Sequence, residues 1–495
     1  MIGHLKRRTV GMAALLLLLP SCAGTQVSHP EPATPPDSYS ARDVREDLDM
    51  LYRTLGEAQY DPYARVTKVA YEQHFEQLRH EITGPMKKPQ AHLLFQKLLA
   101  FGRIAHAHTE APLIDALDAV RAGEPVFPLD VVYRDGKAVL ANWPDATDTL
   151  PPGSRLLAFD GQDMASIDAQ LRNFVSADTD DLLHAQLVKG FPIYLALLFP
   201  GHTSLEVRAV RPDGQEVTHE IRAIAFSEIG TLRKSRPVPR LATDFGSREF
   251  RIDDGIGYLR PGPFSNLPGE KAEDSAGYEP APFVAFLDKA FATFEAAGVK
   301  DLLIDLRGNP GGDNSFSDPM IARFAYRPFR FASRFSLRAS AATKARYAKG
   351  TYEQGTLLAA MVEKEASTPN GTRYDFELPF VEPVEEGRFD GKVWALIDRQ
   401  SYSNAVSVAA ILKDYGFATP LGEATADLAT TYGSVEHFSL PHSKVQVAYP
   451  KSYIVRPNGD ETVHGVQPDI ALAPQPIGES RDVVLEQAYA AIGKR

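Results

Sequence analysis

Apolar residues along the chain follow different spacings in different parts. From 40 to 101 they recur every three or four residues, as in Val44, Leu48, Leu51 and Leu55, which indicates amphipathic helices. Between 125 and 225, short strand-like runs alternate with hairpin turns. From about residue 250, buried-strand runs alternate with helical segments, the order typical of an α/β domain. We therefore expect a helical domain at 40–115, a β-rich domain at 125–225, an α/β domain at 245–475 and a C-terminal helix at 476–495.

The stretch 392–416 joins one such strand to one such helix. Val393–Ile397 is an apolar run of strand length, and Ala405–Leu412 has helical spacing, so the polar letters RQSYSN fall on the turn between them. A serine on this turn, Ser403, can project its hydroxyl at the carboxyl edge of a sheet, beside the unpaired first N–H groups of the helix. Those N–H groups could stabilise an oxyanion. The simpler alternative is that Ser403 is a helix N-cap.

A second strand ends in a glycine-rich turn at 301–314, DLLIDLRGNPGGDN. The glycines allow backbone amides to face a site without side chains in the way. If the two turns lie side by side, they supply a hydroxyl and two sources of N–H donors, which is the minimum for acyl transfer.

Several phrases of the chain resemble the S41 family of serine peptidases. They are IDLRGNPGG, LIDRQSYSNA, GEAT at 422–425, SLPHSKVQV at 439–447 and HGVQPDI at 464–470. The family includes the C-terminal processing peptidases and the tricorn-like proteases. The resemblance implies a crotonase (ClpP)-like α/β core with Ser403 as nucleophile. It also implies an oxyanion hole from Gly311 or Gly312 and the amide of Asn404, with no metal and no organic cofactor.

The resemblance also bears on the base that activates Ser403. Processing peptidases use a lysine, but the matching stretch here, TYGSVE at 431–436, has tyrosine in that place. In tricorn-like relatives a histidine is the base, and His108, in the IAHAHT stretch at 104–109, matches it. Glu461 lies near the place of the orienting carboxylate. Two other interpretations of these letters are a surface histidine near a helix end and a zinc-binding pair formed with His106.

The N-terminus is typical of an exported lipoprotein. Lys6, Arg7 and Arg8 precede a short apolar run, and Leu19–Cys22 resembles a bacterial lipoprotein box. We expect a signal peptide at 1–22, lipidation of Cys22, the only cysteine, and a proline-rich tether at 23–39. Removing the signal would take the formal net charge from −11 to −14. The expected location is the bacterial cell envelope, on a membrane and facing the periplasm.

Composition and motifs together define the predicted function. The acidic charge and the lack of a basic tract argue against nucleic-acid binding. The phrase LPPGSRLLAFDGQDMASIDAQL at 150–171 resembles part of a PDZ domain, which favours a PDZ-like module that captures peptides. We expect a serine endopeptidase of the envelope with a tricorn-like Ser403–His108–Glu461 site, acting on peptides or proteins. The alternative is a catalytically inactive S41-like lipoprotein that binds peptides or envelope partners.

Overall fold

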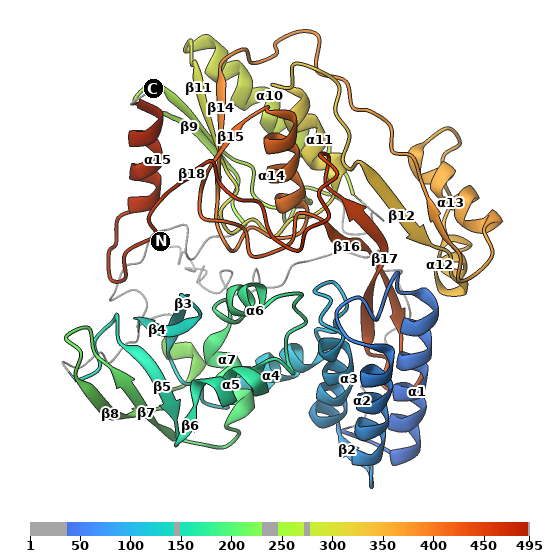
Figure 1. The fold of residues 1–495 in the computed structure, drawn as a ribbon, viewed down its shortest axis with the longest axis vertical. Coiled ribbons are helices and arrows are strands. Elements are labelled where there is room, and N and C mark those ends of the chain that lie inside the picture. Colours follow the sequence, from blue (N-terminus) through green and yellow to red (C-terminus); the bar gives the residue numbers. More distant parts are fainter. Residues whose placement is uncertain (1–36, 143–148, 230–245, 272–277, 494–495) are drawn as a thin grey trace, which may run out of the picture.

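The computed structural model describes residues 37–142, 149–229, 246–271 and 278–493 of the 495-residue chain. The predicted signal peptide, Cys22 and most of the predicted tether lie outside these residues. Three parts are visible in Figure 1: an α/β part at the top, a β-rich part at the lower left and a helical part at the lower right. The predicted α/β class with a helical N-terminal region is confirmed.

A six-stranded sheet forms the centre of the α/β part. In spatial order its strands are β18 (Ile470–Ala471), β15 (Thr419–Gly422), β14 (Lys392–Ile397), β11 (Asp301–Asp305), β10 (Ile256–Arg260) and β9 (Glu249–Asp253). All neighbours pair in parallel except β9, which is antiparallel to β10. Because β11 and β14 are adjacent and parallel, the turns that follow them lie at the same edge of the sheet.

Helices cover both faces of this sheet, which explains why its strands are continuously apolar. One face packs against α10 (Ala281–Ala296), α11 (Asn314–Ala322) and α14 (Asn404–Tyr415). Leu302 and Ile304 of β11 point to that face, while Leu303 points to the other, where α15 (Val483–Gly493) packs. The alternation of buried side chains therefore fixes the strand orientation.

The helical part consists of α1 (Ala41–Ala58), α2 (Lys68–Glu81), α3 (Lys88–Phe101) and α4 (Ala111–Arg121). The apolar faces of α1, α2 and α3 form one core, in which Leu48 and Leu51 are fully buried. Ser40 and Thr67 cap α1 and α2 through their side-chain oxygens. A short ladder, β1 (Ser38–Tyr39) with β2 (Met86–Lys87), closes its end.

A second sheet joins the α/β part to the helical part. Its strands, in spatial order, are β13 (Arg373–Asp375), β12 (Arg334–Arg338), β17 (Gln446–Val455) and β16 (Thr431–Ser439). The helices α12 (Ala341–Tyr347) and α13 (Leu357–Ser367) lie beside it. The hairpin of β16 and β17 extends to α1 (Figure 1), and Val447 and Tyr449 enter the helical core.

The β-rich part is an antiparallel sheet with three short helices. Its strands, in spatial order, are β3 (Asp130–Arg134), β4 (Lys137–Asn142), β5 (Arg155–Phe159), β7 (Ser204–Val210) and β8 (Glu216–Arg222), with β6 (Gln162–Asp163) paired to β5. The helices are α5 (Met164–Leu171), α6 (Asp180–Leu187) and α7 (Phe191–Leu198). Tyr402 and Ala426 of the α/β part belong to the core of this part, so the two are packed together.

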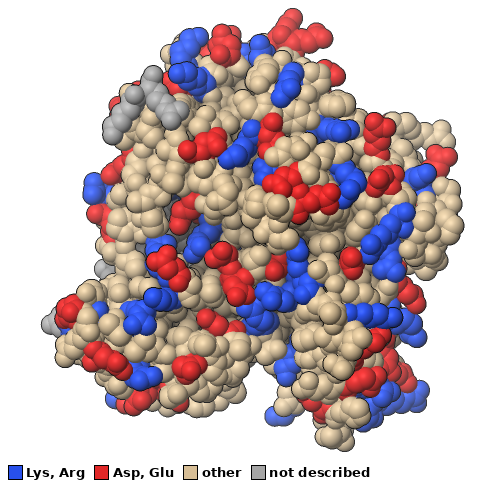
Figure 2. All heavy atoms as spheres, in the orientation of Figure 1, with Lys and Arg blue, Asp and Glu red and all other residues tan. Residues whose placement is uncertain are grey.

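Acidic and basic side chains are interspersed over the face of the molecule in Figure 2, with no large area of one sign. Within the described ranges, none of the helices is both long and apolar enough to cross a membrane.

Candidate active site

Ser403 occupies the turn between β14 and α14 in a strained conformation. Its φ of 53° and ψ of −124° are rare for a residue with a side chain. It stands at the N-cap position of α14, but its side chain makes no capping hydrogen bond. The N-cap interpretation therefore does not account for the hydroxyl, and strain of this kind is common at functional sites.

The histidine that contacts this serine is His106. Its Nε2 lies 3.2 Å from Ser403 Oγ, and its ring stacks on Tyr402 with centroids 5.3 Å apart. The ring is buried between the helical, β-rich and α/β parts. A serine hydroxyl beside an imidazole nitrogen is the arrangement that activates a nucleophile.

His108, the base expected from the sequence, is placed differently. Its backbone pairs with Ala448 of β17 through hydrogen bonds of 3.1 and 2.8 Å, and no contact between its ring and Ser403 is present. Burial, followed by the nearby His106, lowers the pKa of His108 to about 4. The structure therefore places the ring of His106, and not that of His108, against Ser403, and the backbone bridge of His108 to β17 accompanies this arrangement.

The environment of His106 favours its neutral form. Burial lowers its pKa, while Asp178 and the backbone of Tyr432 act in the opposite direction. Its Nδ1 is buried and has no hydrogen-bond partner of good geometry among the described residues. For Nε2 to accept the serine proton, the ring hydrogen must be on Nδ1.

Glu461, the predicted orienting carboxylate, lies at the surface. Its Oε2 accepts hydrogen bonds from Arg334 at 2.8 Å and Tyr453 at 3.0 Å. Its side chain is 48% exposed, and it has no contact with His106 or Ser403. The structure therefore does not bring Glu461 together with the other two predicted residues.

The glycine-rich turn and the serine turn are joined by hydrogen bonds. Gly308 N–H donates to Asp398 Oδ1 at 3.0 Å, and the hydroxyl of Ser401 donates to the Leu306 carbonyl at 2.8 Å. Tyr402 N–H donates to the Asn309 carbonyl at 3.0 Å. The two turns therefore form one unit, as their positions after adjacent parallel strands predict.

Gly311 allows this unit to close around the nucleophile. A Cβ atom at Gly311 would lie 2.7 Å from the Asn404 nitrogen and 2.8 Å from Ser403 Cβ, and its φ is 90°. Its own N–H donates to Asn309 Oδ1, so it is already engaged. Within the described chain, the N–H groups of Gly312 and Asn404 have no acceptor, which leaves these two as the available oxyanion donors.

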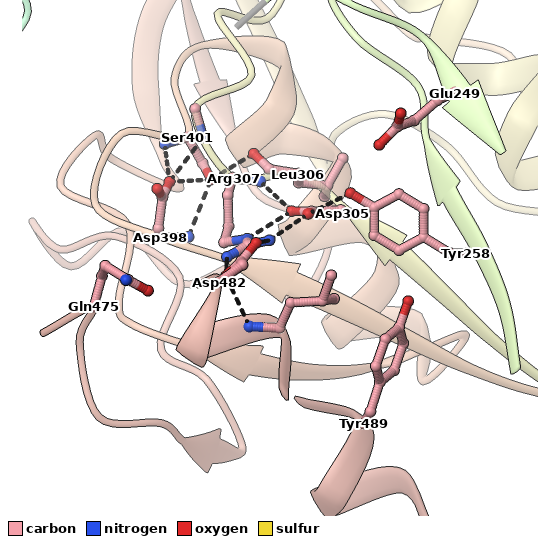
Figure 3. A network of polar contacts seen from close by, with 12 residues as sticks. Glu249, Tyr258, Asp305, Leu306, Arg307, Asp398, Ser401, Gln475, Asp482 and Tyr489 are labelled. Atoms are coloured by element: carbon pink, nitrogen blue, oxygen red, sulfur yellow. Dashed lines mark hydrogen bonds and ion pairs between the residues drawn. The ribbon is translucent and has the colours of Figure 1, made fainter. Parts of the chain in front are cut away.

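A buried arginine anchors the glycine-rich turn. Figure 3 shows Arg307 between Asp305 and Asp482, with Asp398 and Ser401 beside it. The guanidinium bonds to both carboxylates through two nitrogen–oxygen pairs each, at 2.7 to 3.0 Å. The pKa of Asp305 is lowered because Arg307 outweighs the effect of burial. This pairing attaches α15 to the edge of the sheet that carries the site.

Two further acidic residues lie close to the site and are not among the candidate site residues predicted from the sequence. Asp178 Oδ2 accepts the Ala105 N–H at 2.9 Å, and Asp427 Oδ2 accepts the N–H of Ser403 itself at 2.6 Å. Asp427 follows the GEAT phrase at 422–425 but belongs to no pattern that sequence reasoning singled out. His106 was visible in the sequence only as a possible zinc ligand.

Comparison with known proteins finds one matching protein family and several solved structures of similar fold. A sequence model of peptidase family S41 matches residues 256–472, which span both turns and every strand of the central sheet except β9. The solved structure of mature CPAF is similar over 87% of this chain and 93% of its own, with a TM-score of 0.56 and 17% identity. Mature CPAF in complex with lactacystin is similar over 92% and 97%, with a TM-score of 0.59 and 16% identity.

A weaker similarity links the chain to the photosystem II D1 C-terminal processing protease, with a TM-score of 0.42, 16% identity and coverage of 88% and 94%. No curated protein sequence matches the chain.

Proposed function

Because this chain belongs to peptidase family S41 and is a serine-type peptidase, we propose that it is an endopeptidase in which Ser403 and His106 form the catalytic pair. The observation that carries the proposal is the 3.2 Å contact between His106 Nε2 and Ser403 Oγ. The strained backbone of Ser403 and the free N–H groups beside it support the same assignment.

The reaction proceeds in two steps through an acyl-enzyme. Ser403 Oγ attacks the peptide carbonyl carbon while His106 Nε2 takes the hydroxyl proton. The N–H groups of Asn404 and Gly312 stabilise the resulting oxyanion. When the carbon–nitrogen bond breaks, His106 gives the proton to the leaving amine. Water then attacks the ester with His106 as base, which releases the acid and restores Ser403.

The proposed pair differs from both family arrangements considered in the sequence. Tyr432 stands where processing peptidases have a lysine, and it contributes its backbone near His106. Glu461 has its own partners at the surface. We therefore propose that the backbone of Tyr432, and not a carboxylate, orients the imidazole.

Two further parts of the proposal concern location and substrate capture. The basic and apolar N-terminal residues and Cys22 support a lipoprotein of the cell envelope, facing the periplasm. The antiparallel sheet from β3 to β8, with α5 beside β5, supports a PDZ-like module that adds a peptide as an extra strand. Both rest on these features alone.

Labelling with a fluorophosphonate probe tests the catalytic proposal. The purified protein should be labelled, and Ser403→Ala should lose labelling and peptide hydrolysis by about a million-fold. Ser407→Ala, one helical turn further along α14, is the matched control and should label normally. An unlabelled but folded wild type, or normal labelling of Ser403→Ala, would instead support the inactive peptide-binding alternative.

A further inference from the structure

The backbone of the nucleophile is held by a buried carboxylate. Ser403 N–H donates to Asp427 Oδ2 at 2.6 Å, and Leu428 N–H donates to Asp427 Oδ1 at 2.9 Å. Asp427 is fully buried. Both of its oxygens therefore accept main-chain N–H groups, an arrangement that suits the ionised form, since a proton on either oxygen would face an N–H donor.

Among the residues that the structure describes, the cation whose charge acts on Asp427 is Lys189, which comes from another part of the molecule. Lys189 lies in the link between α6 and α7 of the β-rich part, and its Nζ is 5.7 Å from the centre of the Tyr402 ring. Its charge acts on Asp427 and on Asp398 of the serine turn. In Figure 1, α6 lies on the side of the β-rich part that faces the central sheet.

The salt-bridge geometry of the described chain gives Asp427 no direct ionic partner. Asp178 is paired with Arg65 at 3.2 Å, and the charge of Asp427 is one of the causes that raise the pKa of Asp178. His106 interacts with Asp178 and is uncharged when it acts as base. Lys189 is thus the cation that, together with the N–H groups of Ser403 and Leu428, offsets the burial of Asp427.

We propose that Asp427 and Lys189 are positioning residues, in which the lysine of the β-rich part keeps the carboxylate ionised so that it holds Ser403 in its strained, reactive conformation. The proposal deepens the proposed serine peptidase and rests on it. Catalysis would then depend on how the β-rich part packs against the α/β part. If Lys189 moved away, the buried carboxylate of Asp427 would lack a compensating positive charge.

The electrostatics give this proposal a direction with pH. Burial raises the pKa of Asp427 to about 6, while the N–H groups of Ser403 and Leu428 and, after them, the charge of Lys189 lower it. Burial lowers the pKa of Lys189 to about 8, and Asp398 and Asp427 raise it. Below the pKa of Asp427 the carboxylate is protonated, and its hydrogen bond to Ser403 N–H weakens. Above the pKa of Lys189 the lysine loses the positive charge that stabilises the carboxylate.

The test is the rate of fluorophosphonate labelling between pH 5 and 9, measured on the full chain. Lys189→Met should move the midpoint of the acidic limb to higher pH, so that labelling near pH 7 falls several-fold. Lys189→Arg should restore the acidic limb of the wild type and should keep its labelling above pH 8, because arginine stays charged there. Lys444→Met, an exposed lysine bonded only to a nearby carbonyl, is the matched control and should not move it.

Asp427→Asn places an N–H₂ group where one oxygen accepts an N–H. This variant should be labelled roughly ten- to hundredfold more slowly. Its labelling rate should fall with pH only where His106 becomes protonated, below pH 6.5. Circular dichroism would check that each variant folds, and Lys189→Arg and Asp427→Asn keep the test available should Lys189→Met not fold.

The outcomes separate this inference from the proposed function. Superimposable pH profiles for wild type and Lys189→Met would overturn the positioning role while leaving the serine peptidase intact. Loss of labelling at every pH in both Lys189→Met and Lys189→Arg, as in Ser403→Ala, would also overturn it, because lysine would then be the base. An unlabelled wild type would reject the proposed function itself.

Discussion

The two halves of the candidate site are held in different ways. Ser403 lies on a turn whose hydrogen bonds run to the adjacent glycine-rich turn of the same sheet. His106 lies on a segment held from outside the helical part, by Asp178 of the β-rich part through Ala105 and by Ala448 of β17 through His108. The nucleophile is therefore built within one domain, whereas the base is delivered by the packing of three parts.

After the removal of Ser403 itself, the largest effect should come from the base. His106→Asn should lower kcat/KM by about a hundred- to ten-thousandfold, the usual worth of a general base, because Nε2 is the proton acceptor for Ser403. Steady-state hydrolysis of a peptide substrate measures it.

The matched control is His108→Asn, two residues away. Its ring makes no contact with Ser403, so kcat/KM should change little. If His108→Asn lost most of its kcat/KM while His106→Asn stayed active, His108 would be the base. The contact between His106 and Ser403 would then not be the catalytic one.

Much of the nucleophile half could be predicted from the sequence, and little of the base half. Continuous apolar runs identified β11 and β14, and parallel strands place their turns at one edge by local rules of sheet geometry. The choice between His106 and His108 depends on the register of a bridge to Ala448, more than 300 residues later in the chain. No local pattern contains such long-range packing.

The same reason explains the other missed residues. Asp427 contacts Ser403 from 24 residues further along the chain, and Lys189 of the β-rich part contacts Tyr402, so neither lies in a motif with Ser403. Glu461 is predicted from the resemblance because it lies near the GVQPD letters at 465–469, but in the structure its side chain bonds to Arg334.

A Cβ atom on the glycine-rich turn should break the nucleophile half. Gly311→Ala should lower kcat by at least about a hundred- to thousandfold, because the added carbon would displace the Asn404 N–H from its oxyanion position. Both folding and hydrolysis should be measured, since the positive φ adds strain of about 1–2 kcal/mol.

Gly255→Ala separates strain from crowding. Gly255 also has a positive φ, of 83°, but a Cβ there meets nothing within 4 Å. It should lose similar stability and keep its activity. Equal loss of activity in both variants would show that general strain, and not the oxyanion geometry, is responsible.

A smaller effect is expected where the nucleophile half is anchored to α15. Asp482→Ala removes two charge-assisted hydrogen bonds from the buried Arg307, which keeps Asp305 as its partner. The free energy of unfolding should fall by about 1.5–3 kcal/mol in urea titration.

Lys300→Ala is the control for this ion pair. Lys300 and Asp390 lie 3.5 Å apart, with side chains 73% and 75% exposed, so its removal should change stability by no more than about 0.5 kcal/mol. If the two variants lose the same stability, Arg307 is not the anchor that its buried contacts indicate.

The smallest effect should come from the replacement of Glu461. This variant tests whether His106 needs a carboxylate to orient its ring. Glu461→Gln keeps the size of the side chain and removes its charge, while Arg334 and Tyr453 still find an acceptor. We expect kcat/KM to stay within about threefold of wild type, because a half-exposed ion pair contributes little and lies apart from His106. A loss as large as that of His106→Asn would mean that Glu461 moves to the imidazole when substrate binds. The base half would then be completed by the substrate as well as by the packing of the three parts.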